Sequence, residues 1–199
     1  MDNYDKLFTG LKYFLMGRKY NQSLKALEFA RKYHTGLRKD GKSKELIHQL
    51  SICHYIMTLK NVKNEEKVLT CALLHDTMED FDVPVDVMNS EFSPEITKIV
   101  LKLSKVYQGN KKDIKAYFKE ISECEVASIV KGSDRIHNLQ NMVGVFSIPK
   151  QKEYLKEVEE HFIPMIKKAS YNYPEQTEAY LNMKHFLKSQ MELIKALHK

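Results

Sequence analysis

The sequence predicts an all-α fold in a single domain, and three observations support this expectation. The chain has 199 residues, 43% of them hydrophobic, so it is long enough for one substantial core. It contains only 7 Gly and 5 Pro, so residues that favour loops are few. Apolar residues recur at spacings of three and four, as in Leu24, Leu27 and Ala30, whereas the alternation typical of strands is nearly absent.

The same spacing predicts the helices in order along the chain. The first four cover about residues 4–18, 22–34, 45–60 and 65–77. Pro84 and the pair Ser93-Pro94 are typical of helix starts and predict helices at about 84–90 and 94–106. A turn at 107–110 precedes helices at about 111–122 and 124–143. Two more are expected at about 150–170, with a kink at Pro164, and at about 175–198.

Composition limits the class of protein further. The formal net charge is +6 and is spread along the chain, which favours anionic partners modestly and does not indicate nucleic acid. No apolar run approaches the length of a membrane span, and the charged N-terminal segment does not fit a signal peptide, so we expect a cytoplasmic protein. Cys53, Cys71 and Cys124 lack CxxC spacing and are expected to be reduced, buried thiols.

Residues 73–80, LLHDTMED, place a histidine and several carboxylates directly after an apolar run. Ionisable groups beside a core are costly unless something compensates their charge. His48 upstream and Asp134 downstream complete, with His75 and Asp76, a set of two imidazoles and two carboxylates. Such a set suits Mn²⁺, Fe²⁺ or Zn²⁺ and leaves positions open for water and substrate. The sequence therefore predicts a divalent metal site formed by these four residues.

Four segments, taken in order, resemble a known family. They are HTGLRKDGKSKELIH at 34–48, ALLHDTMED at 72–80, VLKLSKV at 100–106 and KGSDRIHNLQNM at 131–142. The order His, His-Asp, Asp resembles the signature of HD phosphohydrolases. The surrounding residues resemble the alarmone hydrolase domain of RelA/SpoT proteins and its small stand-alone relatives. The resemblance covers about residues 25–145, is weaker over the closing helices at about 150–198, and implies one HD-type domain over residues 1–199.

This resemblance implies an activity and a catalytic pair. The family hydrolyses the 3′-pyrophosphate ester of guanosine tetra- or pentaphosphate, (p)ppGpp, to GDP or GTP and pyrophosphate, and its usual ion is Mn²⁺. By position, Glu79 and Asp80 would orient or deprotonate the attacking water. If a helical turn continues past Asp76, both carboxylates can face the open side of the metal.

The resemblance also implies residues that bind the guanine nucleotide, which would be the small-molecule partner of this chain. Arg38 and Lys39 lie in a basic loop, RKDGK, in which the guanidinium can stack on a purine and the lysine can neutralise phosphate. Asn138 corresponds to a nucleotide-contacting asparagine, and Lys105 is a further candidate for phosphate binding. His34, His54 and His137 are expected to orient neighbouring groups rather than to bind metal.

Some positions depart from the family pattern and leave the substrate open. Gln49 stands where the family usually has Pro, Ser43-Lys44-Glu45 replaces Pro-Tyr, and Lys131-Gly132-Ser133 replaces Lys-Leu-Ala. One alternative is an HD phosphohydrolase that acts on NADPH, a deoxynucleotide or a cyclic nucleotide. The other is a non-catalytic nucleotide-binding module, against which the acidic pair argues because a binder of anionic phosphate has no use for extra carboxylates. The oligomeric state is not predicted.

Overall fold

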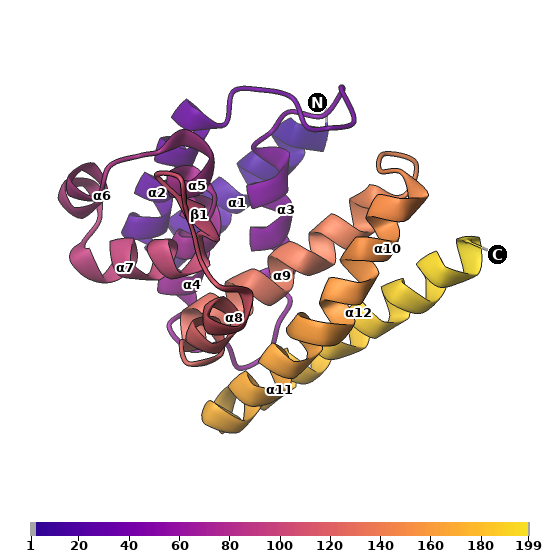
Figure 1. Cartoon of the computed structure of the whole chain (residues 1–199). Helices are drawn as coiled ribbons and strands as arrows, with labels where there is room; N and C mark the ends of the chain where they lie inside the picture. The colour runs from indigo at the N-terminus through magenta and orange to yellow at the C-terminus, as the bar shows by residue number, and fades with distance from the viewer. Residues whose placement is uncertain (1–2, 199) are drawn as a thin grey trace.

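The structure, a computed structural model, describes residues 3–198 and is built mainly of helices (Figure 1). The all-α fold class is confirmed. The elements are α1 (Asn3–Arg18), α2 (Asn21–Tyr33), α3 (Ile47–Ile56), α4 (Glu65–Leu74), α5 (Thr77–Phe81), α6 (Val85–Glu91), α7 (Pro94–Leu103), β1 (Val106–Tyr107), β2 (Asn110–Lys111), α8 (Ile114–Ser122), α9 (Glu125–Met142), α10 (Ile148–Glu157), the π-helical turn η1 (Val158–Phe162), α11 (Ile163–Asn172), the 3₁₀ turn η2 (Pro174–Gln176) and α12 (Thr177–Leu197).

Helix α9 runs through the middle of the molecule and packs against α3, α4, α7, α8, α11 and α12. In Figure 1 the indigo and purple helices α1–α4 lie on one side of it, and the orange and yellow helices α10–α12 lie on the other. Residues on every face of α9 are buried, as in a helix enclosed by others. A Cβ at Gly132 would lie 2.8 Å from the sulfur of Met183 on α12, so glycine at this family-variant position permits the close packing of the two helices.

Local sequence signals explain several helix starts. Ser93 precedes α7 and its hydroxyl accepts a hydrogen bond from the backbone N–H of Ile96, while Pro94 occupies the first turn. Asp113 caps α8 in the same way, because its carboxylate accepts from the backbone N–H groups of Lys115 and Ala116. Each of the two helices buries one apolar face, and both pack against α9.

Three predicted helices end earlier than the apolar spacing suggested. The helix expected at about 45–60 stops at Ile56. The helix expected at about 65–77 stops at Leu74, and a separate short helix, α5, begins at Thr77. The helix expected at about 94–106 stops at Leu103 and gives way to the hairpin β1–β2. Gln108 and Gly109 turn this hairpin with φ of 48° and 76°, which is the left-handed geometry of a tight hairpin turn. The predicted turn at 107–110 is therefore confirmed, but the strands that flank it were not predicted.

The closing helices contain one irregularity. The helix expected at about 150–170 is α10 followed by α11, joined by the π-helical turn η1. Pro164 lies in the first turn of α11, directly after η1. Proline cannot donate a backbone hydrogen bond to the turn before it, and the π-helical turn interrupts the regular α-helical hydrogen bonding at this point. The kink expected at Pro164 stays a prediction.

The composition led to expectations about the cysteines and about membrane-spanning helices, and the structure bears on both. Cys53 and Cys71 are free and buried, as expected, whereas Cys124 is free but only half-buried because it stands at the start of α9. Within residues 3–198, none of the helices combines the length and the apolar character that crossing a bilayer requires.

Candidate metal centre

The centre begins where α4 ends. His75 follows the last residue of α4, and its Nδ1 donates a hydrogen bond to the carbonyl oxygen of Ala72 at 2.8 Å. Since the proton is on Nδ1, the other ring nitrogen, Nε2, presents a lone pair in the neutral ring. That Nε2 is buried, has no hydrogen-bond partner, and lies 3.0 Å from a carboxylate oxygen of Asp76. In the neutral ring two electron-rich atoms would face one another in the interior, so this place favours a bound positive charge.

A second histidine approaches from the start of α3. Ligand atoms of His48, His75 and Asp76 all lie within 4.8 Å of one another. The Nδ1 of His48 lies 2.7 Å from the Nδ1 of His137 on α9, so one ring donates to the other and the orientation of His48 is fixed from behind. Its Nε2 faces the cluster, 3.8 Å from Asp76.

The second carboxylate comes from α9. One oxygen of Asp134 lies 3.2 Å from Nε2 of His48 and 4.0 Å from Nε2 of His75. Its other oxygen lies 3.0 Å from the ammonium of Lys131, one turn earlier on the helix. Burial alone would raise the pKa of Asp134, but Lys131 and the two histidines lower it well below its usual value. The residue is therefore ionised at neutral pH.

Three of these residues, His48, His75 and Asp76, form a group that fits a divalent cation, and Asp134 lies beside it, 3.2 Å from Nε2 of His48. Burial alone would lower the pKa of His75, but Asp76 and Asp134 raise it to about 9, so the pocket strongly favours positive charge beside this ring. The unpartnered Nε2 of His75 is the atom that a metal would take. Two imidazole nitrogens and carboxylate oxygens form a donor set suited to Mn²⁺, Fe²⁺ or Zn²⁺. The geometry leaves the identity of the ion open.

The acidic pair lies on α5, one turn beyond the cluster. An oxygen of Glu79 accepts a hydrogen bond from the backbone N–H of Lys105 at 2.8 Å, so this carboxylate is held by the main chain at the end of α7. Asp80 is exposed at the cavity. Partial burial and the neighbouring charges of Asp76 and Glu79 raise the pKa of Asp80 to about 6. The pair thus offers one fixed carboxylate and one that exchanges protons near neutral pH.

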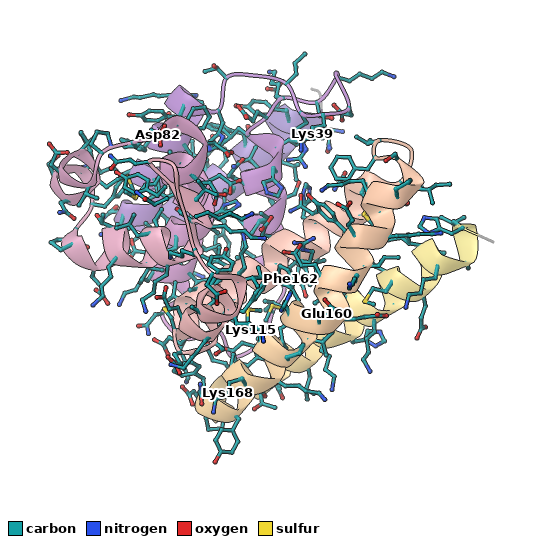
Figure 2. All side chains as sticks on the ribbon, in the orientation of Figure 1. Lys39, Asp82, Lys115, Glu160, Phe162 and Lys168 are labelled. Atoms are coloured by element: carbon teal, nitrogen blue, oxygen red, sulfur yellow. The ribbon has the colours of Figure 1, made fainter. Side chains whose placement is uncertain are left out.

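The basic loop closes on itself opposite this pair. A single antiparallel bridge joins Leu37 to Lys44, and Gly41 turns the loop with φ of +68°. Arg38 is half-buried at the base of the loop, and burial lowers the pKa of its guanidinium from the ordinary value. Lys39, labelled in Figure 2, lies exposed on the loop with its ammonium 5.3 Å from the ring centre of Phe146.

One cavity of about 860 Å³ brings the predicted residues together. Every residue of the predicted metal, catalytic and substrate-binding sets lines it, with the exception of His75, which is buried behind the wall. Two predicted substrate residues are already engaged in this structure. Asn138 donates to Asp134 at 2.6 Å, and the ammonium of Lys105 lies 3.1 Å from a carboxylate oxygen of Glu157. Their roles toward a ligand remain predictions.

The cavity also contains charged residues that sequence reasoning missed. Lys131 pairs with the proposed ligand Asp134, and its position one turn earlier in KGSD is a signal that could have found it. Arg135 and Glu157 form a second ion pair, and no local pattern joins them because they lie 22 residues apart on different helices. His34 and His137 do contact neighbours, Gln49 and His48, in keeping with the orienting role expected of them.

Comparison with known proteins agrees with this arrangement. A family model described as HD domain matches residues 26–168, which is well over half of the chain. The chain belongs to the HD domain family. HD domains bind divalent metals, and the His48, His75, Asp76 cluster is a matching set of ligands, although the ion is not identified.

Relatives of this HD domain are named as enzymes of guanine nucleotides. A protein of Aquifex aeolicus named guanosine-3′,5′-bis(diphosphate) 3′-pyrophosphohydrolase is 28% identical over 146 residues, 71% of this chain and 20% of the relative. A Spiroplasma citri protein with the same name is 26% identical over 70% of this chain and 19% of its own length. A protein of Brucella melitensis named GTP pyrophosphokinase rsh is 28% identical over 71% and 19%. The chain thus spans about a fifth of the length of these relatives. The HD domain family and the two pyrophosphohydrolases support a hydrolase.

Proposed function

We propose that residues 1–199 form one HD-type hydrolase domain that cleaves the 3′-pyrophosphate of guanosine tetra- or pentaphosphate, with Mn²⁺ as its ion. The observation that carries this proposal is the shared cavity, which is lined by His48 and Asp76 of the metal cluster, by the acidic pair and by the basic loop, with His75 buried behind its wall. The names of the relatives support the choice of nucleotide. The cytoplasmic location expected from the sequence stays a prediction.

The ligand set would work as follows. His48, His75, Asp76 and Asp134 hold the cation, with His137 and the carbonyl of Ala72 fixing the two rings. A divalent cation bound there neutralises phosphate charge and lowers the pKa of a coordinated water. Lys131 keeps Asp134 ionised and oriented, so the ligand is ready before the cation arrives.

The acidic pair would handle the water and its proton. Glu79 is suited to orient the attacking water, because its carboxylate is anchored on one oxygen and the other stays free to accept. Water adds to the phosphorus that bears O3′, the bond from phosphorus to O3′ breaks, and one proton of the water ends on O3′. Asp80, with a pKa of about 6, is suited to carry that proton between the two oxygens.

The nucleotide would lie against the basic loop. Arg38 offers a flat guanidinium for the purine, and Lys39 lies beyond it as a charge for phosphate. A second candidate, hydrolysis of another nucleotide such as NADPH, a deoxynucleotide or a cyclic nucleotide, remains because Gln49 and Glu45 line the cavity where the family pattern differs. A non-catalytic binding module is disfavoured by the anchored Glu79.

The test is a substrate panel with and without added Mn²⁺, with products separated by chromatography. We expect conversion of ppGpp to GDP and pyrophosphate, and loss of turnover with a chelator. If ppGpp is recovered intact while NADPH, a deoxynucleotide or a cyclic nucleotide is hydrolysed, the second candidate replaces the first. If ligands bind but none is cleaved, the protein is a binding module.

A matched pair of variants separates the metal site from general damage to α3. His48→Gln removes a proposed ligand and should abolish both metal and turnover. His54→Gln changes a histidine on the same helix whose Nε2 donates to the carbonyl of Leu7, outside the cavity, and should keep both. Loss of metal in both variants would show that the helix, and not the ligand, had failed.

A further inference from the structure

A carboxylate lies between two cations of the cavity. One oxygen of Glu157, the last residue of α10, is 2.5 Å from the guanidinium of Arg135, and the other is 3.1 Å from the ammonium of Lys105. Burial alone would raise the pKa of Glu157, but Arg135 and Lys105 lower it, so the group is ionised at neutral pH. All three residues line the same cavity as the metal cluster.

The geometry of this group is rigid. The guanidinium carbon of Arg135 lies 4.4 Å from the ring centre of Tyr154 and 4.3 Å from that of Phe162, so two aromatic rings hold it. Phe162 is fully buried in η1 and is labelled in Figure 2. The Arg135 side chain is 9% exposed, and its Nε and Nη1 are buried without a hydrogen-bond partner. Glu157 is therefore paired with a cation that is largely buried and packed against two aromatic rings.

The consequence is a local charge balance. Lys105 and Arg135 together carry two positive charges, and Glu157 cancels one of them. A phosphate group that reaches this wall meets a fixed negative charge at salt-bridge distance from both cations. Like charges a few ångströms apart in a partly enclosed site repel by more than they would in bulk water. The ammonium of Lys105, about a third exposed, is thus engaged before any ligand arrives.

We propose that Glu157 is a specificity-determining residue: its carboxylate occupies the cations Lys105 and Arg135 and so limits the number of phosphate groups that the cavity accepts. This inference rests on the proposed function only in taking the substrate to carry phosphate. A short phosphate chain is bound at the metal cluster, whereas a longer chain that extends to this wall gains nothing from the two cations.

The experiment uses binding and needs no turnover. Phosphate, pyrophosphate and tripolyphosphate are titrated by calorimetry into the Mn²⁺-loaded protein, with free Mn²⁺ buffered equally in cell and syringe. In the unmodified protein, we expect tripolyphosphate to bind within about threefold of pyrophosphate. In Glu157→Gln, which keeps the shape and removes the charge, we expect tripolyphosphate to bind about tenfold more tightly than in the unmodified protein.

Glu160→Gln is the matched control, because it makes the same change of charge three residues later. Glu160, labelled in Figure 2, is exposed, pairs with the exposed Lys156 and does not line the cavity. It should leave all three affinities unchanged. An equal gain in tripolyphosphate affinity in both variants would mean that only the net charge matters, and it would overturn the proposal. A Glu157→Gln protein with the same affinities as the unmodified protein would overturn it as well.

The unmodified protein also tests the idea if Glu157→Gln does not fold. A steep rise in affinity from pyrophosphate to tripolyphosphate in the unmodified protein would show that Glu157 does not block the wall, and the proposal would fail. Absence of ppGpp hydrolysis alongside the expected binding pattern would reject the proposed substrate and leave the role of Glu157 standing.

Discussion

Asp134 faces both the histidines of the metal site and the ammonium of Lys131, and replacing it by asparagine should distinguish its effect on metal binding from its effect on stability. Its carboxylate faces His48 and His75 on one side and the ammonium of Lys131 on the other. Asp134→Asn keeps the shape and removes the charge. The ammonium then loses its ion-pair partner while the Lys131 side chain is only 14% exposed. Burial lowers the pKa of Lys131, and Asp134 is the largest of the groups that raise it, so loss of the carboxylate leaves the cost of burial opposed only by Tyr117 and Asp76.

The magnitude follows from that burial. Removing one partner of a buried ion pair costs about 3–5 kcal/mol, because the remaining charge is left uncompensated. For a domain of this size, about 2–4 °C of melting temperature corresponds to each kcal/mol, so we expect a fall of about 6–20 °C. Thermal unfolding is measured in chelator on both proteins, so that bound metal does not contribute to the difference.

A second variant should restore stability without restoring metal binding. Lys131→Met added to Asp134→Asn removes the stranded charge and keeps a long apolar side chain, so most of the lost stability should return. The metal content should stay low in both variants, because an amide is a weaker ligand than a carboxylate. Stability and metal content therefore move independently across the three proteins.

Three results would refute this reasoning. An unchanged melting temperature in Asp134→Asn would mean that Lys131 does not depend on Asp134. A double variant as unstable as the single one would place the cost elsewhere. Full metal occupancy in Asp134→Asn would remove Asp134 from the ligand set.

The remaining predictions concern the acidic pair and the basic loop. Glu79→Gln should keep its metal and lose a factor of about 10² to 10⁴ in turnover, since proton handling typically contributes that much; a metal-free Glu79→Gln protein would make Glu79 a ligand. Arg38→Ala should raise KM about ten- to thirtyfold with little change in kcat, because a stacking contact worth roughly 1–2 kcal/mol is made in ground and transition states alike; unchanged KM would exclude Arg38 from the site. The raised pKa of Asp80, about 6 against 3.8, means that the folded state binds the proton more tightly, so its contribution to stability falls as pH rises between those values. In chelator, Asp80→Asn should therefore be more stable than the unmodified protein at pH 8, by about 1 kcal/mol after discounting for solvent screening, and no different below pH 3.8; equal urea midpoints at pH 8 would contradict the shifted pKa.

Local patterns predicted most of the helices, because the face that a helix buries is written in the spacing of its apolar residues. Ser93-Pro94 marked the start of α7 for the same local reason. The hairpin β1–β2 was not predicted, because strands of two residues are too short to show alternation of polar and apolar residues. The break after Leu74 was not predicted, because the apolar run continues to Leu74 and His75 still has helical backbone angles.

The candidate site likewise contains residues that the sequence predicted and contacts that it did not. His75 and Asp76 are adjacent in sequence, and a family resemblance linked them to His48 and Asp134, which the fold does bring close together. The pairing of Glu157 with Lys105 had no such guide. It joins residues 52 apart through the packing of α10, and a pattern within one helix carries no information about the charge it will meet on another.

The hydrogen bond from the backbone of Lys105 to Glu79 has a consequence for how this protein can be studied and how it can change. Every residue except proline has a backbone N–H group at this position, so replacing Lys105 by alanine leaves the hydrogen bond to Glu79 in place. Most substitutions at position 105 during evolution would also keep it. Proline alone lacks the N–H group. Lys105→Pro is thus the substitution that would expose the anchor, and Lys105→Ala, which leaves the amide, is the one that reports on the ammonium by itself.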